Sequence, residues 1–276
     1  MKLSLSVRVA EGFLSKEVPV IDLETLARMA AEAKFDALCM RASQIGVQSS
    51  PETVAQGKAI LDRHGLDVTM VTGDFDIVYN NDSGPQALRN ITPHLDLAES
   101  LGADLIRVCI KKPEDFPFAH RAAAEGQERG IRLAHQCHAA SLFETVDQIE
   151  GSLKEIDHPN FGIIFEAGNL DECGEPYGPE VIRRLGPSIF NVYLQNQQMN
   201  PQGGITLETY CRGPVTFDVI GFDEPDGIDF RSIFAGLREI DYDGVVTIHQ
   251  SMPDDGTPAE NAIADNAQHL RKLLKR

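Results

Sequence analysis

Residues 161–169, FGIIFEAGN, decide the fold, because five mostly apolar residues lead directly into Glu166. The run does not alternate polar and apolar positions, which is typical of a parallel strand that helices bury on both faces. Residues 131–138, IRLAHQCH, form a similar short apolar stretch that ends in His, Gln, Cys and His. A buried strand needs apolar residues to pack, so coordinating and proton-transferring side chains at its end suggest a site.

Runs of this kind alternate with helical patterns along the whole chain. Eight strands are predicted, at residues 3–9, 37–41, 67–72, 105–110, 131–136, 161–165, 189–195 and 245–249. Eight units in 276 residues give about 35 residues per unit, which matches a (β/α)8 barrel. A doubly wound sheet is the alternative, but it usually has fewer strands, and no GxGxxG motif follows the first strand. We therefore predict an α/β fold, a (β/α)8 TIM barrel, with residues 1–276 as a single domain.

Helix signals separate the predicted strands. One helix is predicted over residues 21–34, a second opens at Ser50-Pro51, and others cover residues 84–101 and 258–275. Ser141 begins a Ser-Leu-Phe-Glu sequence that matches a capping box, which predicts a helix over residues 141–156. Two long connections, residues 73–84 and 196–229, would lie at the C-terminal face of a barrel, where lids over active sites form.

The charge of the chain argues against one broad class of partner. Lys and Arg total 25 against 42 Asp and Glu, which gives a formal net charge of −17. A surface this acidic repels phosphate backbones, so we expect neither nucleic-acid binding nor nuclease activity. No apolar run is long enough to cross a membrane, and the N-terminus lacks the form of a secretory signal, so a cytoplasmic location is expected.

Five widely spaced cysteines occur without a CxxC motif. This pattern argues against a disulfide framework or a structural zinc site, and most of the cysteines are expected to be reduced core thiols.

The predicted strand ends carry the side chains that could perform chemistry. Glu166 follows a buried run, where a carboxylate needs a partner or a metal. His249 follows residues 245–248 in the same way, although a hydrogen-bonded core histidine would fit the same pattern. Side chains alternate between the two faces along residues 131–138, which favours Gln136 and His138 as the pair that faces the barrel axis. His135 would then face the helices.

Three basic residues lie near the ends of predicted strands. Arg41, Arg107 and Lys112 would suit an anionic group of a substrate, and salt bridges to the many acidic residues are the alternative.

Together these strand ends resemble the xylose isomerase-like TIM-barrel family of sugar-phosphate isomerases and epimerases, over nearly the whole chain. The motifs that carry the resemblance are Gly-x-x-Leu-x-x-Gln-x-His at residues 130–138, FGIIFEAGN at 161–169, Gly-Ile-Asp-Phe at 227–230 and Tyr-Asp-Gly at 242–244. The resemblance implies a divalent metal (Mn, Mg, Co or Zn), a small-molecule sugar substrate and a homo-oligomer.

The family's usual ligands, Glu, Asp, His and Glu, fall by position on Gln136, Glu166, Tyr193 and His249. Only Glu166 keeps an acidic side chain where the family has one. The other three positions carry a polar side chain that differs from the usual ligand. This pattern predicts either a re-specified metal site of Gln136, Glu166, Gln195 and His249, or a metal-free polar pocket.

Two asparagines also stand at positions where the family often has other polar residues. Asn169 lies where a His often follows the strand-six Asp, and Asn196 lies where an Asp often follows the strand-seven His. Together with Tyr193, they are predicted to bind substrate.

The function that the resemblance implies is isomerisation or epimerisation of a sugar or keto-sugar, phosphorylated or not. A proton next to a carbonyl would be removed to give an enediolate, with metal assistance. Glu166 and His249 are the candidate base and acid, and His138 could orient a hydroxyl. Two alternatives stay open: a metal-independent lyase or isomerase acting on a sugar derivative, and a non-catalytic sugar-binding barrel.

Overall fold

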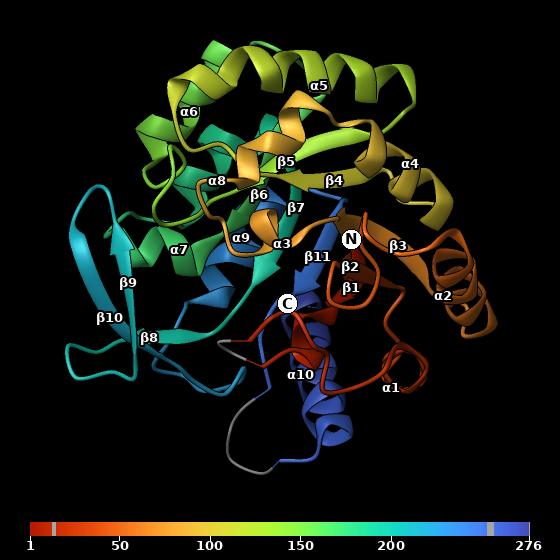
Figure 1. Ribbon diagram of the computed structural model, residues 1–276. Coiled ribbons are helices and arrows are strands. Elements are labelled where there is room, and N and C mark those ends of the chain that lie inside the picture. Colours follow the sequence, from red (N-terminus) through yellow and green to blue (C-terminus); the bar gives the residue numbers. More distant parts are fainter. Residues whose placement is uncertain (13–14, 253–256, 276) are drawn as a thin grey trace.

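The computed structural model describes residues 1–12, 15–252 and 257–275, and a closed barrel of eight parallel strands forms its centre (Figure 1). The strands are β1 (Lys2–Ser6), β2 (Ala37–Arg41), β3 (Asp67–Thr72), β4 (Leu105–Val108), β5 (Arg132–Gln136), β6 (Phe161–Glu166), β7 (Ile189–Leu194) and β11 (Val245–Ile248). They follow one another around the barrel in chain order, and β11 closes onto β1. The predicted (β/α)8 TIM barrel is confirmed.

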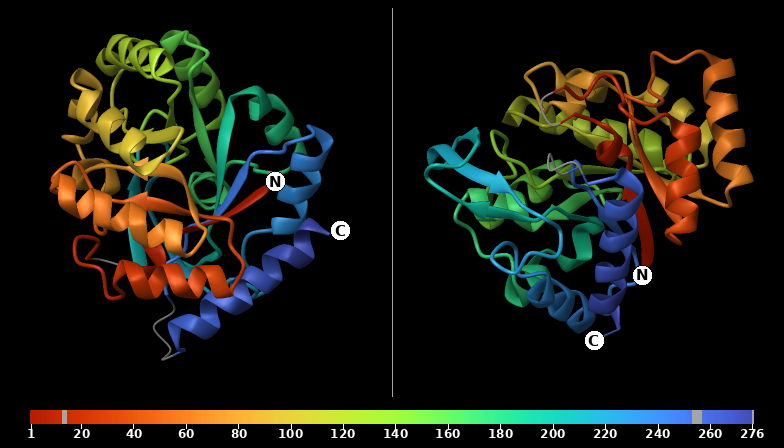
Figure 2. Two further views of the ribbon diagram at one scale, coloured as in Figure 1. Left: turned by 90° about the vertical axis from the view of Figure 1, so that its right-hand side faces the viewer. Right: turned by 90° about the horizontal axis from the view of Figure 1, so that it is seen from below.

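Helices surround the barrel on its outer side (Figure 2). They are α1 (Leu23–Glu32), α2 (Pro51–Arg63), α3 (Phe75–Val78), α4 (Thr92–Leu101), α5 (Phe116–Glu128), α6 (Val146–Ile156), α7 (Ala167–Glu172), α8 (Pro179–Leu185), α9 (Phe230–Glu239) and α10 (Ala259–Leu274). Several begin at side-chain caps that the sequence signals predict. Asp22 accepts the N–H of Thr25 at 3.0 Å, and Ser50 accepts the N–H of Thr53 at 3.2 Å.

The barrel interior has an apolar layer with polar side chains above it. The apolar layer consists of Cys39, Met70, Leu105, Ala134 and Ile164, and the Tyr193 ring, level with Glu166, packs against it. Two residues further along β2, β4 and β6 come Arg41, Arg107 and Glu166. Because side chains alternate along a strand, these residues face the same interior at the C-terminal ends of the strands.

Most predicted boundaries agree with the structure to within two residues, and three elements differ by more. The first strand stops at Ser6 rather than residue 9, because the Ser6 hydroxyl caps a 3-10 helix, η1 (Val7–Ala10). The helix predicted over residues 84–101 is divided into η2 (Gly84–Arg89) and α4, with Asn90 between them at φ −147°. Pro93 suits the first turn of α4 because that turn needs no N–H donor there.

The helix predicted from Ser141 begins at Val146 instead. Thr145 and Gln148 form the capping box that starts α6. Ser141 lies in the preceding turn, where its hydroxyl donates to the carbonyl of His138 at 2.6 Å.

The connection of residues 196–229 contains a three-stranded antiparallel sheet in the order β8–β10–β9: β8 (Gln197–Met199), β10 (Gly213–Val219) and β9 (Ile205–Thr209). Its β9 and β10 strands extend away from the barrel at the left of Figure 1. Glu144 attaches their turn to the barrel by accepting the N–H groups of Tyr210 at 2.7 Å and Cys211 at 2.8 Å.

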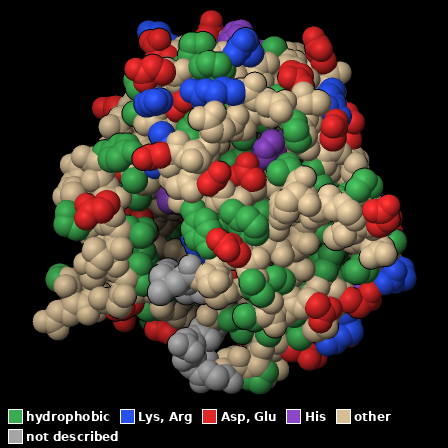
Figure 3. Space-filling view, viewed as in Figure 1, with side chains coloured by type: hydrophobic (Ala, Val, Ile, Leu, Met, Phe, Trp, Pro, Cys, Tyr) green, Lys and Arg blue, Asp and Glu red, His purple; other side chains and the backbone are tan. Residues whose placement is uncertain are grey.

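Acidic and basic side chains are interspersed on the face shown in Figure 3, without a large basic area. All five cysteines are free and four are buried, as expected for core thiols. Within the described ranges, the helices are too short or too polar to span a lipid bilayer.

Candidate active site

The candidate site is the polar ring at the C-terminal ends of the barrel strands. Its members are Ser6, Arg41, Thr72, Arg107, Gln136, Glu166, Tyr193 and His249, and all of them are buried. Six of these eight residues were predicted from their positions at strand ends. The structure brings these six together.

Glu166 is the carboxylate of this ring that is best placed for proton transfer. Only 2% of the residue is exposed, and its carboxylate accepts hydrogen bonds from the amide of Gln136 and, at 2.7 Å, from that of Asn169. Burial raises its pKa to about 7, although the two amides and the nearby guanidinium groups partly oppose the increase. A carboxylate with a pKa near the working pH is suited to general base catalysis.

His249 directly follows β11, and its ring stacks on that of Tyr193 from the neighbouring strand β7, with the centroids 3.8 Å apart. Its Nδ1 is 2.9 Å from Ser6 Oγ, and its Nε2 is 3.4 Å from Arg41 Nη1. Because a guanidinium can only donate, Nε2 is the acceptor and Nδ1 carries the proton that is donated to Ser6. Burial, followed by the charge of Arg41, holds the imidazole pKa well below its usual range, so His249 is neutral.

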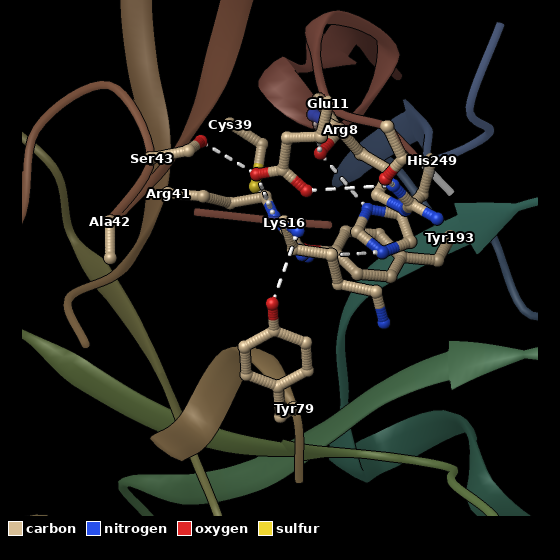
Figure 4. A network of polar contacts seen from close by, with 12 residues as sticks. Arg8, Glu11, Lys16, Cys39, Arg41, Ala42, Ser43, Tyr79, Tyr193 and His249 are labelled. Atoms are coloured by element: carbon tan, nitrogen blue, oxygen red, sulfur yellow. Dashed lines mark hydrogen bonds and ion pairs between the residues drawn. The ribbon is translucent and has the colours of Figure 1, made fainter. Parts of the chain in front are cut away.

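Glu11 organises the basic side of the ring (Figure 4). Its Oε1 accepts from Arg41 Nε at 2.9 Å and from the Ser43 hydroxyl at 2.6 Å, and its Oε2 is 3.6 Å from Arg8 Nη1. Arg8 was not predicted, because residues 3–9 were interpreted as one strand, and Glu11 lies just beyond that range. The signal was present as two charged residues three positions apart, after a run of apolar residues and serines.

Lys16 reaches the same group from the connection between η1 and α1. Its backbone N–H donates to the Tyr79 hydroxyl at 3.1 Å, and its Nζ lies 5.5 Å from the centre of the Tyr79 ring. Burial, together with the charges of Arg8 and Arg41, lowers the pKa of this amine to about 7. Two connections that are distant in sequence therefore meet beside the ring, and the sequence contained no recognisable signal for this pairing.

The other side chains predicted around β5 take different positions. His138 lies just beyond the strand, where Nδ1 is 2.8 Å from the carbonyl of Ala139 and 3.2 Å from the Asn80 amide. His135 faces away from the axis and stacks on Phe143 with the ring centres 4.2 Å apart, as alternation predicts.

Two residues predicted to bind substrate are placed apart from the ring. Lys112 is exposed and lines a surface cavity of about 320 Å³ together with Arg89 and Tyr210. Asn196 uses its amide to hold the connection before α9, because it donates to Gly221 O at 2.8 Å and accepts from the N–H of Ile228 at 2.9 Å. These contacts give Asn196 a structural role.

Tyr193 and Gln195 also use their polar atoms within the protein. The Tyr193 hydroxyl is 3.2 Å from Cys39 Sγ in the barrel interior, so this residue supports His249 through its ring. The Gln195 amide donates to Gln197 Oε1 at 2.9 Å.

The residues predicted to hold a metal do not fit a divalent cation as they are placed. The His249 nitrogen that would coordinate a metal faces the Arg41 guanidinium instead. Gln136 directs its amide nitrogen toward Glu166, which leaves its buried oxygen unpartnered. A cation at that oxygen would have Glu166 as its anionic ligand, and the charges of Arg41 and Arg107 would oppose it.

A different group has closer coordinating atoms. Among the described residues, one set of three His, Cys, Asp or Glu side chains has ligand atoms within 4.8 Å of one another: Glu144, Cys173 and Cys211. This group lies at the turn between β9 and β10, where Glu144 already accepts backbone N–H groups. It is therefore separate from the polar ring.

Comparison with known proteins identifies a family and a relative to which this chain is similar. The family described as xylose isomerase-like TIM barrel matches residues 27–273. An inosose dehydratase of Geobacillus kaustophilus is 33% identical over 137 residues, which are 47% of this chain and 42% of that protein. The match thus covers less than half the length of this curated relative.

Solved structures with the same fold have lower sequence identity. A probable 3-DHS dehydratase from Bacillus anthracis superposes with a TM-score of 0.71 at 17% identity, covering 98% of this chain and 99% of that one. A D-allulose 3-epimerase from Methylomonas sp. gives a TM-score of 0.70 at 16% identity, covering 99% and 98%. A Mycobacterium smegmatis protein solved in complex with magnesium gives 0.69 at 14%, covering 99% and 96%.

Proposed function

The chain belongs to the xylose isomerase-like TIM barrel family, and from this premise we propose that it is an enzyme that removes a proton next to the carbonyl of a small polyhydroxylated substrate. The observation that carries the proposal is Glu166, a buried carboxylate of the polar ring whose pKa is raised to about 7. The curated relative is a dehydratase, and the structural neighbours include both a dehydratase and an epimerase.

The first step uses residues that the barrel places together. The Glu166 carboxylate takes the proton from the carbon next to the carbonyl, and the released electron pair forms the double bond of an enediolate. The negative charge that develops on the carbonyl oxygen is stabilised by the positive charges of Arg41 and Arg107, both of which also act on Glu166. No step in this proposal passes through a metal, because the residues that would hold one do not fit it.

His249 supports this chemistry as a neutral group. Its imidazole is fixed between Ser6 and Arg41, so it helps to orient the guanidinium.

Three outcomes follow from the same enediolate. Protonation of the former carbonyl carbon, with loss of the proton from the other enediol oxygen, gives an isomer. Protonation of the original carbon on its other face gives an epimer. Departure of a β-hydroxyl group, which takes up a proton and leaves as water, gives a dehydrated ketone. Dehydration is the first outcome to assay, because the relative with 33% identity is an inosose dehydratase. Isomerisation and epimerisation of keto-sugars form the second set of assays.

The shared first step can be tested without knowing the final product. The protein is incubated in deuterated water with cyclic keto-polyols and ketoses, and NMR monitors exchange of the proton next to the carbonyl. Hydroxylated keto acids are included in the same set of compounds. We expect exchange with at least one compound of the set, and Glu166→Gln is expected to slow it by about 10³-fold. Glu172→Gln is the matched control, because Glu172 is also buried and has a raised pKa, of about 8, but lies on α7 outside the ring.

Two results would contradict the proposal. Equal exchange by the wild type and Glu166→Gln would remove Glu166 from the reaction. Tight binding of a sugar without exchange, unaffected by that substitution, would instead identify a non-catalytic sugar-binding barrel.

A further inference from the structure

The polar ring concentrates positive charge inside a protein whose formal net charge is −17. Arg41 and Arg107 belong to the ring, and Arg8, which is also buried, lies beside it. Glu11 pairs with two of them, at 3.6 Å from Arg8 and 2.9 Å from Arg41. Arg107 has no such partner among the ion pairs of the described residues.

Arg107 is an unusual buried guanidinium. It is 2% exposed, its neighbour on β5 is the small Ala134, and its Nε is buried without a hydrogen-bond acceptor. Across the described part of the chain, its side chain makes neither a hydrogen bond nor an ion pair. Burying a charged group in this way costs folding free energy, so an arginine kept in this position suggests an anionic ligand.

Arg41 provides a second donor of the same kind. Its Nε is used by Glu11 and its Nη1 faces His249, but its Nη2 is buried and unpartnered. Arg41 on β2 and Arg107 on β4, with only β3 between their strands, therefore each keep an unused N–H donor, and the charge of Arg41 acts on Arg107. The charges of both act on Glu166, which indicates that both lie near the reacting end of the site.

We propose that Arg107, together with Arg41, binds a carboxylate of the substrate, so that the substrate class is a polyhydroxylated keto acid rather than a neutral keto-sugar. This inference rests on the proposed function, because it concerns the same ring. A carboxylate offers two coplanar oxygens, which match donors from two planar guanidinium groups.

The local charge also favours a carboxylate over a phosphate ester. Among the described residues, three guanidinium groups lie close to two carboxylates, Glu11 and Glu166, and the Lys16 amine, whose pKa is lowered to about 7, adds positive charge when protonated. The ionised group of side chains is therefore net positive, and a single carboxylate offsets the excess that the arginines contribute. Once Lys16 is neutral, a phosphate dianion would leave an unbalanced negative charge beside Glu166 and would oppose its ionisation.

The test compares ligands that differ only in the anionic group. Thermal shift and titration calorimetry are used with D-glucuronate, D-glucose and D-glucose 6-phosphate, and with quinate against myo-inositol. We expect the two carboxylates to bind and stabilise the wild type, with little effect from the neutral compounds. Arg107→Gln should weaken carboxylate binding at least about tenfold, Arg107→Lys should weaken it less, and the exposed-site control Arg231→Gln should leave it unchanged.

A ligand-free measurement separates this role from a structural one. Removal of an unpaired buried charge should leave the melting temperature of unliganded Arg107→Gln equal to or above that of the wild type, whereas loss of a structural contact would lower it. The proposal is overturned if no tested carboxylate gives Arg107-dependent binding, if neutral compounds bind as well, or if the phosphate ester alone binds.

The same experiment distinguishes this inference from the proposed function. Proton exchange with neutral keto-sugars, without any requirement for a carboxylate, would refute the inference and leave the proposed function intact. Arg107-dependent binding of carboxylates without proton exchange in any keto compound would do the reverse.

Discussion

At the scale of single residues, burial disfavours the charged form of Glu166, and the same burial makes this carboxylate suitable as a base. Glu166 is buried with amides as its hydrogen-bond partners, and the nearby guanidinium groups do not form an ion pair with it among the described residues. This arrangement leaves its pKa near neutrality, whereas a direct Arg partner would hold it low. The site therefore retains a base that can both gain and lose a proton at physiological pH.

The pH dependence of turnover should report two groups with opposite requirements. Glu166 acts when deprotonated, so activity should rise as pH increases through about 7. Lys16 adds positive charge only when protonated, so that contribution should fall as pH increases through about 7. We expect a narrow bell-shaped profile of kcat/KM, measured from pH 5 to 9 with the substrate that exchanges fastest.

Lys16→Arg provides the decisive variant for this profile. An arginine stays charged over the whole range, so the alkaline limb should move up by about one pH unit or more while the acid limb remains. An unchanged alkaline limb would show that Lys16 does not contribute to that part of the profile.

Stability should show the same ionisation without any substrate. The folded-state pKa of Glu166 is raised above its unfolded value, so the folded protein holds this proton more tightly and loses stability as pH rises from about 4.5 to about 7. Glu166→Gln removes that loss, and we expect it to gain about 2 kcal/mol relative to wild type between pH 5 and pH 8. Urea unfolding at both pH values measures the difference, and a pH-independent difference would show that the pKa is not raised.

At the scale of elements, the sequence predicted the existence of the helices more reliably than the residues at which they begin. Two successive capping-box patterns occur before α6, at residues 141–144 and 145–148. The first was selected, but Glu144 is used instead by the turn between β9 and β10, which is more than 60 residues away in the sequence. A local pattern could not show that tertiary contacts had already used this carboxylate.

Glu144 should therefore control the attachment of the β9–β10 hairpin. Its carboxylate accepts the N–H groups of Ala140, Tyr210 and Cys211, and hydrogen bonds to a charged acceptor are stronger than neutral ones. Glu144→Ala should cost about 2–3 kcal/mol of stability and should increase hydrogen exchange in residues 205–219. Glu208→Gln, an exposed change on the same hairpin, is the control and should alter neither quantity.

If Glu144→Ala left hydrogen exchange in the hairpin unchanged, the hairpin would be held by its apolar contacts. Faster exchange throughout the barrel as well would indicate general destabilisation rather than release of one element.

At the scale of the whole molecule, the barrel could be predicted because its signal is repeated. Most of the eight parallel strands are near-continuous apolar runs that are buried on both faces, so an error of a few residues in one strand does not change the fold. Closure also explains why Arg41, Arg107, Gln136, Glu166 and His249 could be predicted as a group. Their strands end at one rim whatever the intervening sequences are.

The parts of the site that were missed depend on connections rather than strands. Glu11 binds Arg41 from the segment after η1, and Lys16 meets Tyr79 across 63 positions of sequence. Such contacts have no periodic pattern, because connections vary in length and conformation. The barrel therefore fixes where chemistry occurs, while the connections determine which charges surround it.

The balance of charge over the whole molecule also bears on metal content. A divalent cation could find many carboxylates on this acidic surface, but the ring itself presents arginines and a histidine whose free nitrogen faces one of them. We expect elemental mass spectrometry of protein purified without chelator or a histidine tag to find well below one Mn, Mg, Co or Zn per chain. EDTA should change neither the melting temperature nor proton exchange.

The control for this measurement is the second group of coordinating atoms. If one metal per chain is found, Cys173→Ser with Cys211→Ser shows whether the group at the hairpin turn holds it. A metal that survives those changes but is lost in Glu166→Gln would place the cation in the ring. It would then have displaced the Arg41 contact from His249, and the metal-free mechanism would be wrong. Retention of proton exchange after metal removal would instead leave Glu166 and the guanidinium groups as the groups that perform the reaction.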